Sequence, residues 1–154
     1  MAGKQKESGD SGIDKVDASY LESLMGYNAR RASLAIVGEF LKKMSVYNLR
    51  PVDFSVLSLI THNAGITSRQ LCSALSLLPP NLVAMINALE ARGLIERRAH
   101  PSDGRAFALH MSSKGQKLMG LAEETAAQLE VDATRRLSPA ESKTLIRLLK
   151  KIYL

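Results

Sequence analysis

The chain has 154 residues, 45% of them hydrophobic and 5% aromatic, with one cysteine and no tryptophan, which predicts one compact soluble domain. Its 21 lysines and arginines exceed its 15 aspartates and glutamates, giving a net charge of +6. The lone Cys72 excludes an intramolecular disulfide, and no apolar run of about 18 residues or charged-then-apolar leader is present, so neither membrane insertion nor secretion is expected. We therefore expect a cytoplasmic protein.

The positive charge lies in the part of the chain that is expected to fold. Residues 1–17, expected to be a disordered tail, carry three lysines against four acidic residues, so residues 18–154 carry +7. Lysines and arginines that neutralise phosphates release condensed counterions, and a basic domain therefore favours a polyanionic partner. A basic surface that merely aids solubility is the alternative.

Two helices are predicted first. Apolar residues at three- and four-residue intervals indicate a long amphipathic helix over residues 20–47. Its apolar surface is wider than one face of a lone helix needs, so part of it is expected to pack against another subunit. Pro51 opens a second helix, which carries Phe54 and Leu57 and ends at residues 63–65.

Two shorter segments with helical spacing follow, separated by a tight turn at residues 76–78. A Thr-x-x-Gln capping box at Thr67 begins a third, short helix. Pro79 and Pro80 then begin a fourth helix, in which apolar residues recur at i, i+3, i+4 and i+7 and which Gly93 ends.

A β-hairpin is predicted after the fourth helix. The pattern changes to period two over residues 94–98, and Phe107, Leu109 and Met111 alternate in the same way. The residues between the two runs combine proline, glycine and charges, which are typical of a turn.

Two further helices are predicted at the C-terminal end. Ser112 caps a fifth helix that continues to about residue 136, and a capping box at Ser138 begins a final helix. Apolar residues cover more than half the girth of the final helix. Such a helix is an exposed liability in a monomer, but it becomes an interface in a dimer.

Three short helices followed by a hairpin, within residues 51–111, predict a winged helix-turn-helix whose recognition helix, residues 79–92, enters the major groove. The order and spacing resemble those of the MarR family of bacterial and archaeal regulators. Four motifs carry the resemblance: Leu-Glu-Ala-Arg-Gly-Leu-Ile-Glu-Arg at residues 89–97, Pro-Ser-Asp-Gly-Arg-Ala at 101–106, Met-Ser-Ser-Lys-Gly at 111–115 and Leu-Ser-Pro-Ala-Glu at 137–141.

The resemblance implies a mainly α-helical fold with a small β-hairpin wing. Residues 49–111 would form the winged helix-turn-helix, and residues 18–48 and 112–154 a helical dimerisation region. It further implies a homodimeric repressor that binds a pseudo-palindromic operator in double-stranded DNA and is released by a small effector. Such a regulator would be associated with the nucleoid and would need no cofactor.

The chain departs from the family pattern at both elements that contact DNA. At positions 78–84, where members commonly show serines, threonines and an arginine, it reads Leu-Pro-Pro-Asn-Leu-Val-Ala. Asn81 is then the best candidate for a base-edge hydrogen bond, because an asparagine amide pairs in both senses with adenine. A phosphate or water contact is the alternative. In the wing, Gly104 stands where many members have a minor-groove arginine.

Asp103 and Arg105 match the ion pair that shapes the wing in the family, and an exposed pair contributes only about 0 to 1 kcal/mol. Arg98, His100 and Arg105 are expected to contact phosphates or the minor groove, with a solvated hairpin charge as the alternative for each. The residues predicted to contact DNA are Arg69, Ser76, Pro80, Asn81, Ala84, Asn87, Arg98, His100, Arg105 and Lys114.

The resemblance also implies an effector pocket between the first, second and fifth helices. The candidates to line it are Tyr27, Arg31, Leu34, Phe54 and Leu57. Rings would bury the apolar part of an aromatic acid or its thioester while arginine pairs with the anion. In the alternative, Tyr27 and Leu34 are dimer core and Arg31 is a solvated helix charge.

Other chemistry is not indicated. The three histidines, His62, His100 and His110, lack the close spacing of metal ligands, so no metal site is expected. Cys72 lies beside Leu71 in the third helix and is expected to be a small core residue, with a redox sensor as the alternative. No Gly-rich phosphate loop, Gly-x-Ser-x-Gly elbow or carboxylate pair at helix spacing is present, so an enzyme is not expected.

The scarcity of polar residues on the recognition helix motivates a rival function. A winged-helix dimer could use the apolar surface of residues 77–83 to hold another protein and bind DNA weakly or without sequence preference. The two functions differ in behaviour, because DNA reading predicts steep salt sensitivity and discrimination among duplexes, whereas a protein adaptor predicts neither.

Overall fold

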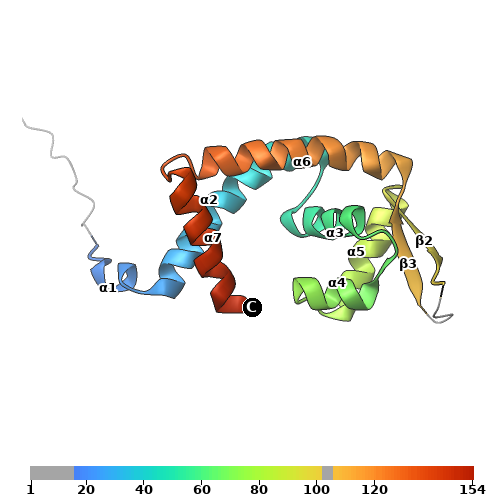
Figure 1. Ribbon diagram of the computed structural model, residues 1–154, viewed down its shortest axis with the longest axis horizontal. Coiled ribbons are helices and arrows are strands. Elements are labelled where there is room, and N and C mark those ends of the chain that lie inside the picture. Colours follow the sequence, from blue (N-terminus) through green and yellow to red (C-terminus); the bar gives the residue numbers. More distant parts are fainter. Residues whose placement is uncertain (1–15, 102–105) are drawn as a thin grey trace, which may run out of the picture. The chain divides into compact units, whose positions relative to one another are not determined.

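The computed structural model describes residues 16–101 and 106–154 (Figure 1). Its elements are α1 (Ser19–Glu22), α2 (Met25–Met44), the 3₁₀ turn η1 (Ser45–Tyr47), α3 (Pro51–His62), β1 (Ile66–Thr67), α4 (Ser68–Leu75), α5 (Pro79–Ala91), β2 (Ile95–Ala99), β3 (Phe107–Met111), α6 (Ser113–Ala133) and α7 (Pro139–Tyr153). The predicted fold class, mainly α with a small β-hairpin, is confirmed. The chain divides into two units, one ending at Leu34 and the other comprising Ala35–Leu154. The tail predicted for residues 1–17 falls almost wholly outside the described residues.

The predicted hairpin belongs to a three-stranded antiparallel sheet of order β1-β3-β2. β2 pairs with β3 from Ile95 opposite Met111 to Ala99 opposite Phe107, and β1 pairs with the other edge of β3. β1 was not predicted, because a two-residue strand is too short to show a period. Phe107 is 61% exposed, contrary to the burial that its alternation with Leu109 and Met111 suggested. It lies at the loop end of the hairpin, whereas the other two side chains lie over the core.

The core joins the helices of the second unit to the sheet. Its fully buried large side chains include Leu57 and Ile60 of α3, Leu71 of α4, Leu82, Ile86 and Leu89 of α5, Ile95 and Leu109 of the sheet, and Met119 of α6. The apolar stripe predicted for α5 is therefore buried. Because one side of α5 faces the core, its opposite side is left exposed.

The long helix predicted for residues 20–47 is divided, which corrects the sequence-based expectation. α1 ends at Glu22 and α2 begins at Met25. The side-chain Nδ2 of Asn28 donates to the backbone oxygens of Glu22 and Leu24 at 2.7 and 2.8 Å. In a continuous helix, the Glu22 oxygen would instead accept from a backbone N–H. The chain breaks again after η1, where Asn48 has a φ of 51°. Apolar spacing continues across both breaks and therefore conceals them.

No single helix in the described ranges is long and apolar enough to cross a membrane. α4 and α5 reach that length and composition only as a pair, and the pair is bent by 116°. The apolar side chains of this pair include Leu71, Leu82 and Leu89, which are buried in the core. Core packing thus accounts for the hydrophobicity of these side chains.

Asp53 is a charged side chain that is buried at the start of α3. The Nε and Nη2 atoms of Arg50 donate to its carboxylate oxygens at 2.8 and 2.9 Å, and the backbone N–H of Arg50 donates at 3.2 Å. Burial acts to raise the pKa of Asp53, but the hydrogen bonds from Arg50 and the positive charges of Arg50 and Arg92 together hold this pKa below its ordinary value.

We expect Asp53→Asn to lower the free energy of unfolding at pH 7 by about 1 to 2 kcal/mol, a modest loss because the Arg50 side chain is largely exposed and the pair is screened. A lowered folded-state pKa stabilises the fold above the pKa of the unfolded chain, and this stabilisation disappears as pH falls through the folded value. Urea denaturation at pH 7 and below about pH 4 checks this, since the wild type should approach the variant in acid. Equal stabilities at pH 7 would contradict it.

Candidate nucleic-acid interface

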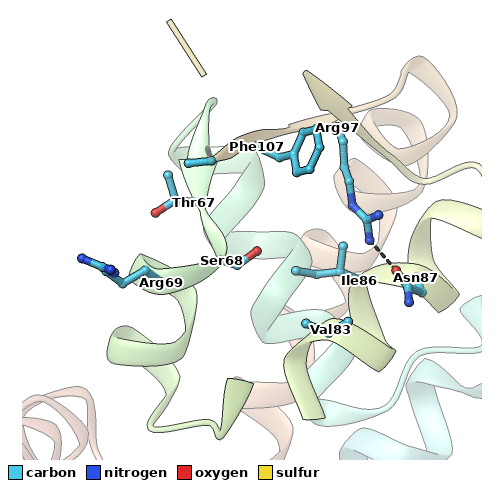
Figure 2. A pocket seen from close by; sticks show the side chains of 9 residues that line it. Thr67, Ser68, Arg69, Val83, Ile86, Asn87, Arg97 and Phe107 are labelled. Atoms are coloured by element: carbon cyan, nitrogen blue, oxygen red, sulfur yellow. Dashed lines mark hydrogen bonds between the residues drawn. The ribbon is translucent and has the colours of Figure 1, made fainter. Parts of the chain in front are cut away.

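The exposed side of α5 lies between two hollows. The larger, about 860 Å³, separates α5 from the start of α4 and the hairpin, and we call it the wing cleft (Figure 2). It is lined by Thr67, Ser68, Arg69, Val83, Ile86, Asn87, Arg97, Ala106 and Phe107. The smaller, about 320 Å³, lies on the flank of α5 toward α3, and we call it the α3 hollow. It is lined by Arg50, Val52, Asn81, Ala84, Met85 and Ala88.

Arg97 connects the hairpin to α5 across the wing cleft. Alternation along β2 places Arg97 on the strand face of the buried Ile95, so its side chain points toward the helix. Its Nη2 donates to Oδ1 of Asn87, as Figure 2 shows, and its Nη1 lies 3.4 Å from Oε2 of Glu90. The sequence-based list of DNA contacts omitted Arg97, although its parity with Ile95 was the available signal.

The start of α4 forms the opposite side of the wing cleft. The predicted capping box is present: the N–H of Gln70 donates to Oγ1 of Thr67 at 3.3 Å, and the N–H of Thr67 donates to Oε1 of Gln70 at 2.9 Å. Arg69, in the first turn of α4, is exposed and lies across the cleft from Arg97 (Figure 2). A cleft with an arginine on each side and a helix N-terminus at its edge is electrostatically suited to a phosphate chain.

The two asparagines predicted to contact DNA lie on different flanks of α5. Asn81 lines the α3 hollow beside Arg50, and Asn87 lines the wing cleft, where it accepts from Arg97. Of the other residues predicted in this region, Pro80 and Ala84 are exposed on α5, and Ser76 is exposed at the C-terminal cap of α4 with a φ of 51°. Their contacts with DNA stay predictions.

Lys114 binds the C-terminal end of α5. Its Nζ donates to the backbone oxygen of Arg92 at 2.8 Å, and a cation at this end of a helix offsets its partial negative charge. Beside it, Oγ of Ser112 donates to the backbone oxygen of Gly93 at 2.6 Å and accepts from the N–H of Gly115 at 2.9 Å. Lys114 thus stabilises the C-terminal end of α5. Its predicted contact with DNA stays a prediction.

The wing residues are only partly within the described chain. Arg98 lies on the strand face opposite Arg97, with its Nη2 3.2 Å from Oε2 of Glu96. His100 is half-buried, and its backbone N–H donates to the backbone oxygen of Ala106 at 3.3 Å. Asp103 and Arg105 lie outside the described residues. The ion pair and the wing contacts predicted for these residues therefore stay predictions.

This chain is similar in sequence and in structure to known proteins. The sequence pattern of the MarR family matches residues 47–106. A protein of Thauera aromatica named for transcriptional regulation of the hcr operon is 32% identical over 130 residues, which are 84% of this chain and 78% of that protein. The transcriptional repressor CouR bound to a 23-mer DNA duplex is 33% identical, with a TM-score of 0.86 over 91% of this chain and 99% of that one. The chain belongs to the MarR family.

A second similar structure contains a bound ligand. CouR bound to p-coumaroyl-CoA is 32% identical and has a TM-score of 0.80, over 90% of this chain and 97% of that one. The family and its relatives are DNA-binding transcriptional regulators and not enzymes, and this holds for the present chain.

The structure explains two of the MarR-family motifs physically. In the first, Gly93 has a φ of 70°, which glycine adopts without strain, and it lets the chain turn from α5 into the buried Leu94. In the second, Ser112 caps α6, and Gly115 lies so close to the Leu94 backbone that a side chain would not fit. Both motifs therefore fix the junction between the recognition helix, the wing and α6.

The five residues predicted to line an effector pocket are divided between the two units. They are Tyr27, Arg31 and Leu34 in the first, and Phe54 and Leu57 in the second. Within α2, the guanidinium carbon of Arg31 lies 5.9 Å from the ring centroid of Tyr27, within cation–π range. Phe54 packs edge-on against Phe40 with ring centroids 5.6 Å apart, and Leu57 is fully buried in the core. Their role in effector binding stays a prediction.

Cys72 and His62 make contacts within the fold. Cys72 is half-buried and packs against the core, as the core interpretation predicted. Nε2 of His62 lies 2.9 Å from Oε1 of Glu123, which ties α3 to α6. Over residues 16–101 and 106–154, no group of three histidine, cysteine or acidic side chains could hold a metal ion.

Proposed function

We propose that this MarR-family regulator is a homodimeric repressor that binds a pseudo-palindromic operator and is released from it by a small effector. The wing cleft is the observation that supports operator binding. When the recognition helix of a winged helix-turn-helix enters the major groove, the adjacent phosphate chain runs between that helix and the wing. Arg69 and Arg97 stand on the two sides of this path. Such a regulator acts in the cytoplasm, at the nucleoid.

The DNA contacts divide by position. Arg69 and Arg97 bind phosphates from the wing cleft, and Arg98, His100 and Arg105 contact the backbone or minor groove from the wing. Asn81, Pro80 and Ala84 face the major groove from α5, while Ser76 and Lys114 stand at the ends of the helix-turn-helix. Phosphate contacts of this kind set register and orientation, whereas contacts to base edges set sequence preference.

A second copy of the chain covers the apolar side of α7 in this proposal, with residues 18–48 and 112–154 as the dimerisation region. The exposed large apolar side chains of α7 are Leu145, Ile146, Leu148, Leu149 and Ile152, each between 39% and 67% exposed. Contiguous apolar surface of this kind marks an interaction site, and a two-fold dimer is its simplest occupant.

We expect Ile146→Glu to convert the protein to a monomer, because it places a charge within this apolar surface. Arg147→Glu, on the polar side of the same helix, is the matched control and should leave the dimer intact. Analytical ultracentrifugation measures both. A dimeric Ile146→Glu protein, or a wild type that is monomeric at micromolar concentration, would show that α7 does not form the interface.

The proposed effector is an aromatic acid or its CoA thioester. Tyr27 and Arg31 supply an aromatic ring and a cation within one helix, and the ligand of CouR, p-coumaroyl-CoA, is such a thioester. An effector acts by binding the DNA-incompetent dimer more tightly, which shifts the spacing of the two recognition helices away from one turn of DNA. A coupling free energy of about 1 to 3 kcal/mol weakens operator affinity roughly 5- to 150-fold.

The experiment titrates p-coumaroyl-CoA, free p-coumaric acid and CoA into a complex of the protein with fluorescent operator DNA, with calorimetry to establish which ligands bind. The expected result is release of DNA by the thioester or the acid, with an affinity loss of about 5- to 150-fold at saturation. If the ligands bind and the affinity for operator DNA stays unchanged, the result would contradict release of the operator by an effector. Failure of all three to bind would exclude this effector class.

A second candidate, the protein adaptor, is favoured by one observation. Leu78 and Val83 are 68% and 51% exposed, at and near the start of α5, where a recognition helix is usually polar. In that case the protein would bind all duplexes equally and weakly.

A further inference from the structure

The exposed side of α5 is apolar at its N-terminal end, the part of a recognition helix that contacts base edges. The exposed apolar residues there are Leu78, Pro80, Val83 and Ala84, which we call the apolar crest. The first two turns of α5 contain a single side chain with hydrogen-bonding groups, Asn81. Direct reading of bases by hydrogen bonds is therefore restricted to one residue in this part of the helix.

The two asparagines of α5 do not replace the missing polar groups. Asn87 lies further along α5 in the wing cleft, and its side-chain oxygen accepts from Arg97. Asn81 lies on the other flank, in the α3 hollow beside Arg50. Of the crest residues, Val83 lines the wing cleft and Ala84 the α3 hollow, whereas Leu78 and Pro80 line neither. The apolar crest therefore extends across the exposed side of α5 from one hollow to the other.

Charge on both sides of the crest favours DNA as its occupant. Arg69 and Arg97 lie at the wing cleft on one side, and Arg50, 67% exposed, lies at the α3 hollow on the other. A helix flanked in this way matches a major groove, whose two edges are phosphate chains. A protein partner would need complementary acidic groups at both flanks.

The major groove offers an apolar helix one kind of base-specific partner, the 5-methyl group of thymine. We infer that the apolar crest reads thymine methyl groups, so that operator specificity comes from methyl contacts in addition to any hydrogen bond of Asn81. Val83, which is 51% exposed, supplies a branched aliphatic side chain on the helix itself, while the small Ala84 lets the helix approach the base pairs closely. The inference rests on the proposed binding of operator DNA by α5.

The test begins with a duplex selected from a random pool by the wild-type protein. Each symmetric pair of thymines is then replaced by uracil, which removes two methyl groups and keeps every hydrogen-bonding group. We expect at least one pair whose replacement weakens binding about tenfold, since burial of one methyl group corresponds to roughly three- to fourfold in each half-site. At the same pair, 5-methylcytosine is expected to bind several-fold better than cytosine.

A double-mutant cycle assigns the effect to the crest. Val83→Ala is expected to reduce the uracil penalty from about tenfold to less than about threefold, because it removes the partner of the methyl group. Val83 is half-exposed, and an unchanged melting temperature confirms that the variant folds. Asn81→Ala is the control and should keep the full uracil penalty.

The outcomes separate this inference from the proposed function. Specific binding with uracil equal to thymine at every position overturns methyl reading and leaves the operator proposal intact. If Val83→Ala leaves the uracil penalty unchanged, the methyl group is not read by the crest, and the inference is overturned. If crest variants bind DNA with unaltered affinity, the surface belongs to a protein partner, and the inference is likewise overturned. If no duplex is enriched from the pool, the proposed function itself fails and the inference falls with it.

Discussion

Gly115→Ala is expected to lower the free energy of unfolding by about 3 kcal/mol or more, through overpacking of a tight junction. A Cβ at this position would lie 2.0 Å from the backbone oxygen of Leu94, 2.9 Å from its carbonyl carbon and 2.8 Å from Cε of Met111. The Leu94 oxygen cannot move aside easily, because it accepts from the N–H of Ser112 at 3.0 Å. The start of α6 would have to shift away from the recognition helix and the wing.

The matched control is Gly120→Ala, one helical turn and a half further along α6. A Cβ there meets nothing within 4 Å, and alanine is favoured over glycine in a helix by about 1 kcal/mol. Chemical denaturation should therefore show an unchanged or raised stability for Gly120→Ala and a large loss for Gly115→Ala. Similar stabilities for the two variants would mean that the junction is more tolerant than its geometry indicates.

Arg97→Ala is expected to weaken operator binding by the proposed homodimer roughly 60-fold near 0.1 M salt and to lower the salt exponent by about 2, because each phosphate contact contributes about 0.9 and the dimer presents two copies. The guanidinium has five N–H donors, so its contacts with Asn87 and Glu90 leave donors for a phosphate. Fluorescence anisotropy at several salt concentrations measures both quantities. An unchanged salt exponent would show that Arg97 does not bind DNA.

Asn87→Ala separates the two roles of this contact. If Asn87 only positions Arg97, its removal keeps the cation, so affinity should fall modestly and equally for all sequences. If Asn87 instead reads a base, the preference at one operator position should relax. Selection from a random duplex pool with the variant distinguishes these results.

Elements with local signals were predictable from the sequence. The capping boxes at Thr67 and Ser138 and the prolines at positions 51 and 79 mark helix starts within the chain itself, and the structure places α4, α7, α3 and α5 there. The division at Ser23 and Leu24 was not predictable, because it depends on a side-chain hydrogen bond of Asn28 that leaves the apolar spacing unchanged. Similarly, the fifth helix, predicted to reach about residue 136, ends at Ala133.

The candidate site was less predictable than the fold. Motif position led to α5 and the hairpin as the candidate site. The pairing of Arg97 with Asn87 and Glu90 joins a strand to a helix, and composition does not show such a contact. Lys114 similarly looked like a free cation, yet its ammonium binds the backbone of Arg92. Tertiary geometry, which residue spacing does not encode, decides which charges a DNA phosphate can reach.

A direct titration tests whether the protein binds DNA in a sequence-specific manner. The duplex most enriched from a random pool by the wild-type protein is compared with a scrambled duplex of the same length and composition, at two salt concentrations. We predict binding at least about a thousandfold tighter to the enriched duplex, with affinity for both falling steeply as salt rises. Equal and weak binding to the two duplexes, whatever its salt dependence, would contradict sequence-specific binding and favour a protein adaptor.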